Sequence, residues 1–145
     1  MNAIIHSDEE IRRILTGICD LTLPKSDWTH EAHFAAAIAM MSDSRFDAFK
    51  DMPKTIKAYN IATGVQNTDH DGYHHTITIA SLFTVRAMTK DRRNPLIVTL
   101  REILSAEYGQ SNWLLTYWSK ETLFSVEARK TWVEPDIRHL PFETT

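Results

Sequence analysis

Histidines gather in two short segments of the chain, where their spacing suggests a shared chemical role. His30 and His33 are three residues apart, so on a helix their rings can point to the same side. His74 and His75 form the second group. In both segments an aspartate stands three residues before the first histidine. On a helix, an acid at this spacing can bind the same metal as the histidine, as the Glu-x-x-His pairs of helical di-iron proteins do.

Imidazole nitrogens together with carboxylate oxygens suit zinc, iron, manganese or nickel. We therefore predict a divalent transition metal at this site, held by His30, His33 and His74. The groups that could complete the ligand set, or orient a ligand, are Asp27, Asp71 and His75. Such a site would suit a metal-dependent enzyme acting on a small molecule. The sequence does not separate hydrolysis by a metal-bound water from oxygen chemistry, so it assigns no reaction.

Two alternatives use the same residues without a metal. Asp27 and Asp71 are suited to cap helix N-termini, which requires no ion. The histidines could then line a pocket for an anionic or polar small molecule. Polar residues that could join such a pocket are Tyr59, Asn60, Asn67, Thr78 and Arg129. In the other alternative the protein is a structural or interaction protein that forms a homodimer through its C-terminal tail.

Two familiar metal motifs fail, one on its spacing and the other on a missing ligand. The zinc-protease signature needs histidines four residues apart, and His30 and His33 are one residue short of that. The segment from Asn67 to Gly72 resembles the start of an EF-hand loop. The twelfth position of that loop is Thr78, where a bidentate glutamate would close the calcium cage. Neither motif therefore assigns a metal.

The composition is that of a globular protein and excludes several classes. The 145 residues carry a formal net charge of −3 without a long basic run, which argues against a nucleic-acid partner. No apolar run approaches the roughly 20 residues needed to cross a bilayer, and the first residues do not resemble a signal peptide. We expect no membrane partner and a cytoplasmic location. Cys19 is the single cysteine, and its apolar neighbours predict a buried, inert thiol.

Apolar spacing and capping residues predict an all-α fold, an irregular bundle of about six or seven helices in one domain over residues 1–145. A capping box formed by Ser7 and Glu10 starts the first helix, and Gly64 ends the third in a left-handed conformation. The other expected helices cover about 27–41, 53–62, 71–89, 95–104, 111–118 and 119–132. Two prolines keep the segment 134–141 from being helical throughout, so an extended tail should pack on the body or on a partner, where Arg129 could pair with Asp136.

Three segments resemble a group of small bacterial helical proteins of uncharacterised activity. Their signatures are W-T-H-x-A-H, matched from Trp28 to His33, then G-Y-H-x-T-I-T, matched from Gly72 to Thr78, then A-R followed by P-D, matched at 128–129 and 135–136. The resemblance implies a bacterial helical protein with a histidine site and names no reaction. The related sequences carry a glutamate where this chain has His75, so a chemistry that depended on that glutamate would be lost or altered here.

Overall fold

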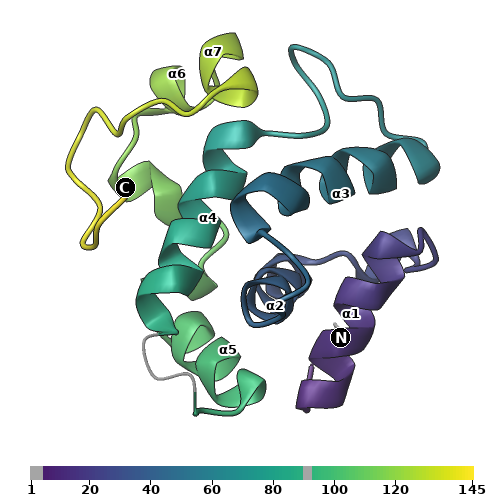
Figure 1. Ribbon diagram of the computed structural model, residues 1–145. Helices are drawn as coiled ribbons and strands as arrows, with labels where there is room; N and C mark the ends of the chain where they lie inside the picture. The colour runs from purple at the N-terminus through teal and green to yellow at the C-terminus, as the bar shows by residue number, and fades with distance from the viewer. Residues whose placement is uncertain (1–4, 90–92) are drawn as a thin grey trace.

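The computed structural model describes residues 5–89 and 93–145, and these residues confirm the all-α prediction (Figure 1). Within those ranges the chain forms seven α-helices and no strand. The five longer helices are α1 (Asp8–Cys19), α2 (His30–Met41), α3 (Ala48–Ala62), α4 (His75–Met88) and α5 (Leu96–Ser105). Two short helices follow, α6 (Lys120–Leu123) and α7 (Val126–Lys130). Single 3₁₀ turns occupy Lys25–Asp27, Glu107–Gly109 and Trp113–Thr116.

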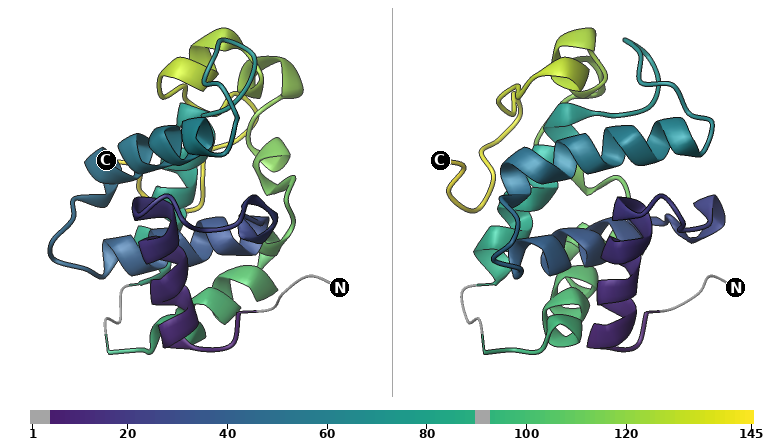
Figure 2. Two further views of the ribbon diagram at one scale, coloured as in Figure 1. Left: turned by 90° about the vertical axis from the view of Figure 1, so that its right-hand side faces the viewer. Right: turned by 45° about the vertical axis from the view of Figure 1, so that its right-hand side comes forward.

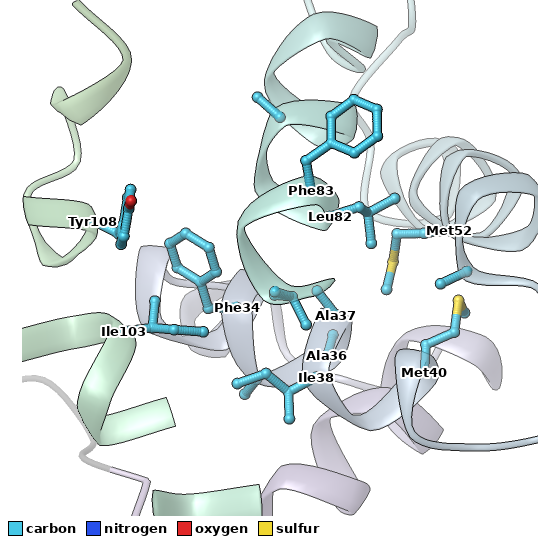
Figure 3. Close-up of a cluster of buried hydrophobic side chains, with 14 of the residues drawn as sticks. Phe34, Ala36, Ala37, Ile38, Met40, Met52, Leu82, Phe83, Ile103 and Tyr108 are labelled. Carbon is cyan, nitrogen blue, oxygen red and sulfur yellow. The ribbon is translucent and has the colours of Figure 1, made fainter. Parts of the chain in front are cut away.

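Helix α2 is the centre of the core and contacts α1, α3, α4 and α5 (Figure 1). It is apolar around almost its whole circumference, and every residue from Phe34 to Met40 is buried. A helix of that composition is stable only when other helices cover all its faces. Figure 3 shows Met52 of α3, Leu82 of α4 and Ile103 of α5 packed around it.

Local capping chemistry explains where α1 and α2 begin. The Ser7 hydroxyl accepts the Glu10 N–H at 3.1 Å, as predicted. The Glu10 carboxylate reaches back to the N–H of His6, at 2.7 Å, rather than to that of Ser7. Helix α2 is capped by Thr29, whose hydroxyl accepts the Ala32 N–H at 3.1 Å.

Helix α3 begins five residues earlier than the sequence predicted, so Pro53 lies inside it. The earlier start is stabilised by Asp51, whose carboxylate accepts the N–H of Asp47 at 2.8 Å. Pro53 is buried on the core side, where its ring adds apolar contact. At the other end Gly64 has a φ of 87°, and the left-handed stop predicted for this residue is confirmed.

The region after α5 departs most from the prediction. The expected helix over 111–118 is only the 3₁₀ turn around Leu114, and the expected helix over 119–132 divides into α6 and α7. The division occurs because Ser125 caps a new helix, its hydroxyl accepting the Ala128 N–H at 3.1 Å. The side chains of Trp113 and Trp118 are buried here and belong to the core.

The C-terminal tail is extended and runs back over the body of its own chain (Figure 2). Its backbone is held by Trp118, whose indole N–H donates to the carbonyl of Val133 at 2.9 Å, and by Tyr117, whose carbonyl accepts the Ile137 N–H at 2.9 Å. Leu140 is buried. The tail therefore covers its own bundle, and dimerisation through it stays a prediction.

The structure also bears on two further predictions, the burial of Cys19 and the lack of a membrane-spanning segment. Cys19 is exposed, at the last turn of α1, so the prediction of a buried thiol was wrong. In the described part of the chain, none of the helices has the length and apolar character to cross a membrane.

Candidate functional site

His74 is buried at the start of α4 and both of its ring nitrogens are hydrogen-bonded. Its Nδ1 accepts the N–H of Ile77 at 3.2 Å, which makes the imidazole the N-cap of the helix. Its Nε2 lies 2.7 Å from the carbonyl oxygen of Leu123 in α6. A carbonyl only accepts, so Nε2 carries the proton and Nδ1 is the acceptor. Burial lowers the pKa of His74 below its usual value, which keeps this neutral form.

The two histidines of α2 also bond to backbone carbonyls. His30 Nε2 donates to the carbonyl of Tyr108 at 2.7 Å and so ties α2 to the turn after α5. His33 Nδ1 donates to the carbonyl of Thr29 at 2.7 Å. The ring of His33 stacks on Trp28 with 3.8 Å between ring centroids. His33 keeps an exposed edge, yet desolvation by the surrounding chain lowers its pKa.

These side chains do not form the metal-ligand set that their spacing suggested. Among the described residues, no three histidine, cysteine, aspartate or glutamate side chains lie close enough together to hold an ion. His74 has no lone pair left for a metal unless the cap of α4 opens. The donor set therefore does not fit a resident transition metal, and the metal-dependent enzyme stays a prediction without support from this geometry.

Neither aspartate caps a helix. Asp27 ends the 3₁₀ turn before α2, and Thr29 takes the capping position. Asp71 is an exposed loop residue, and His74 caps α4 in its place. His75, the other predicted additional ligand, forms a hydrogen bond with Tyr73, whose hydroxyl lies 2.8 Å from His75 Nδ1. Both capping assignments were wrong because loop geometry brought other acceptors to the helix ends.

The predicted pocket residues Tyr59 and Thr78 bond to backbone elsewhere. The Tyr59 hydroxyl donates to the carbonyl of Leu23 at 2.8 Å, and the Thr78 hydroxyl donates to the carbonyl of His74 at 2.9 Å. The first bond joins α3 to the segment after α1, and the second lies within the first turn of α4, so neither hydroxyl is left free for a ligand.

Asn60 and Asn67 shape the long polar loop between α3 and α4. The Asn67 Oδ1 accepts both the Asn60 amide N–H₂ and the N–H of Tyr73, each at 3.0 Å. Asn67 Nδ2 donates to the carbonyl of Lys57 at 3.1 Å. Gly72 has a φ of 81°, and a Cβ there would lie 2.4 Å from the carbonyl oxygen of Gln66. The loop can close around Asn67 only because residue 72 is glycine.

Arg129 joins the short helix α7 to the same loop. Its Nη1 donates to the carbonyls of Gly72, at 3.1 Å, and Tyr73, at 3.4 Å. The expected pairing of Arg129 with Asp136 is absent; the Asp136 carboxylate accepts both the N–H and the hydroxyl of Ser119, at 2.8 and 2.7 Å. Asp136 thus fixes the tail at the start of α6, and Arg129 faces the loop instead.

A hollow of about 330 Å³ lies where the loop, α3 and α7 meet. Figure 1 shows the loop arching from the end of α3 back to α4, close to α7. The residues that line it include two from the predicted pocket set, Asn67 and Arg129, together with Lys57, Thr68, Asp69, Tyr73 and Lys130. It is the size of a small-molecule site.

The charge of this hollow is strongly positive. Lys57, Arg129 and Lys130 supply three positive groups, and Asp69 supplies the single negative one among the lining residues. The Lys57 ammonium lies over the ring of Tyr73, 5.0 Å from its centroid. Burial raises the pKa of Tyr73 to about 12, so the phenol stays neutral and adds no negative charge. The lining carries a net charge of +2 in a protein whose overall charge is −3.

A second hollow, lined by described residues, carries a smaller net charge of +1. It has a volume of about 410 Å³, lies beside α5 and is lined by two arginines and by Asp8. The Asp8 carboxylate is already used there, since it accepts the N–H groups of Leu96 and Ile97 at 3.1 and 2.9 Å. We therefore take the hollow between the loop, α3 and α7 as the candidate site and call it the cationic hollow.

Sequence reasoning missed Lys57, Tyr73 and Lys130. The two lysines are more than 70 positions apart, and nothing in their local sequence shows that they converge. The adjacent Arg129 and Lys130 were a weak signal of a locally positive surface, because Arg12 and Arg13 form a similar doublet elsewhere in the chain.

Comparison with known proteins adds no family or homologue. No family model matches the chain, and neither a curated protein nor a solved structure does.

Proposed function

We propose that this protein is a metal-free binding module for a small anionic ligand, held in the cationic hollow. The observation that carries the proposal is the convergence of Lys57, Arg129 and Lys130 on one hollow that contains a single carboxylate. Like charges are unfavourable together, so an anion that bridges them would lower the energy of the folded state.

The chemistry of the cations favours an oxyanion, either a phosphate or a carboxylate. A guanidinium presents planar donors that match such groups, and ammonium groups bind them as point charges. Arg129 is held at its Nη1 by two carbonyls of the loop, which orders the side chain before a ligand arrives. Preordering of this kind reduces the entropy lost on binding.

Isothermal titration calorimetry with inorganic phosphate and with acetate tests the proposal. We expect wild type to bind at least one of these anions, and Lys57→Ala to weaken the affinity by about fivefold, the effect of losing one partly solvated charge-assisted hydrogen bond. Lys54→Ala is the matched control, since Lys54 is exposed on the same helix and outside the hollow. Absence of binding by wild type, or equal losses in the two variants, would refute the proposal.

A further inference from the structure

The carboxylate of Asp69 forms an ion pair with Lys130, one of the three cations of the hollow. Its Oδ1 lies 2.7 Å from Nζ of Lys130, and both side chains are more than half exposed. The neighbouring ammonium lowers the pKa of the Asp69 carboxyl, so the carboxylate stays charged near neutral pH. A carboxylate on an ammonium is also the contact that an oxyanion ligand would make.

The loop has a base, at Asn67 and Tyr73, and a tip, residues 68–71. The ion pair of the tip can open while the hydrogen bonds of the base stay intact. The base is fixed by the side chain of Asn67, which bonds to α3 and to the end of the loop. The tip is closed on itself by Thr68, whose hydroxyl accepts the N–H groups of His70 and Asp71 at 3.3 and 3.1 Å. Among the interactions of the described residues, the ion pair with Lys130 is what joins this tip to α7.

We propose that Asp69 is an internal competitor, and that the anionic group of the ligand replaces its carboxylate on Lys130. This inference rests on the proposed function and names the contact that the ligand takes. An exposed ion pair of this kind contributes little to stability, so an incoming oxyanion can displace it. With Asp69 displaced, all three cations of the hollow face the ligand.

The test compares Asp69→Asn with Asp71→Asn in phosphate titrations by calorimetry. Both variants remove one negative charge from the same loop, but Asp71 is exposed and outside the lining of the hollow. We expect Asp69→Asn to bind inorganic phosphate about three- to fivefold more tightly than wild type, because the competing ion pair is gone. Asp71→Asn should change the affinity by less than about 1.5-fold, because salt screens an exposed charge.

Amide NMR gives a second measurement on wild type. Phosphate should shift the backbone signals of His70 and Asp71 as the tip leaves Lys130, and it should shift them much less in Asp69→Asn. Equal affinities of the two variants would overturn the inference even where wild type binds phosphate through Lys57. A lack of phosphate and acetate binding in wild type and in Asp69→Asn alike would overturn the proposed function with it.

Discussion

His74 and the cationic hollow are neighbours through Tyr73, which lines the hollow and precedes His74, and they use polar groups in opposite ways. The imidazole of His74 is buried and bonded at both nitrogens, so it joins the start of α4 to α6. The ammonium groups of Lys57 and Lys130 are exposed and lie around an open hollow. Residue types that are typical of catalysis hold the backbone together here, and residues that are usually surface groups converge on a site. An imidazole that is bonded at both nitrogens has no atom left for a ligand, whereas an exposed ammonium can exchange one partner for another.

The largest effect should come from His74. We expect His74→Ala to lower the free energy of unfolding by about 3 kcal/mol, since it removes a helix cap and leaves a buried carbonyl of Leu123 unpaired. His74→Asn keeps an N-cap acceptor and loses the bond to Leu123, so its loss should be roughly half as large. Urea unfolding measures both. A loss below about 0.5 kcal/mol in His74→Ala would show that the histidine is not structural.

Gly72 and Gly64 give a matched pair for the loop that shapes the hollow. Both have positive φ, but a Cβ at Gly64 would meet nothing within 4 Å, whereas one at Gly72 would collide with Gln66 and Asn67. Gly64→Ala should cost about 1 kcal/mol for the left-handed backbone alone. Gly72→Ala should cost about 2–3 kcal/mol, because overpacking adds to the same strain. Equal losses in thermal unfolding would contradict the close approach at Gly72.

Acid should destabilise the histidine region. The folded-state pKa values of His33, His74 and His75 are all lowered, each mainly by desolvation. In the unfolded chain these rings take up protons near pH 6.5. The stabilisation is therefore complete above that pH, and it is lost as the pH falls toward the lower folded-state values. Urea midpoints between pH 7.5 and 5.5 should fall, with a shallower slope in His74→Asn; an unchanged slope would exclude His74 as a source.

The smallest effect on stability should come from the hollow. The double variant Lys57→Ala/Lys130→Ala removes two exposed ammonium groups, one of them in a surface ion pair. We expect the free energy of unfolding to change by less than about 1 kcal/mol. The same variant should abolish measurable phosphate binding. A large loss of stability would mean that these lysines are as structural as His74.

Local signals in the sequence predicted the helices well where the cap is a near neighbour. Ser7 and Gly64 act as expected because their partners lie within four residues. The start of α3 and the break at Ser125 were missed, since Asp51 and Ser125 supply acceptors for backbone N–H groups that the apolar spacing does not reveal. Local sequence determines that a helix forms, and the choice among nearby capping residues determines the residue at which it begins.

The candidate site was less predictable because its parts come from distant positions. The histidine partners Tyr108 and Leu123 are 78 and 49 residues away from His30 and His74, and they act through carbonyls that every residue has. A sequence pattern cannot show that such a carbonyl will meet an imidazole. The expected capping roles of Asp27 and Asp71 failed for a local reason, since Thr29 and His74, a few residues further along the chain, take the capping positions.

Nitrogen-15 NMR of the imidazole rings, with zinc added to one equivalent, tests the central claim most directly. The bonding of His74 predicts a neutral ring that is protonated at Nε2, with signals that zinc leaves unchanged. Joint shifts of His30, His33 and His74 that saturate at one equivalent would contradict this account and establish the metal site that the sequence spacing suggested.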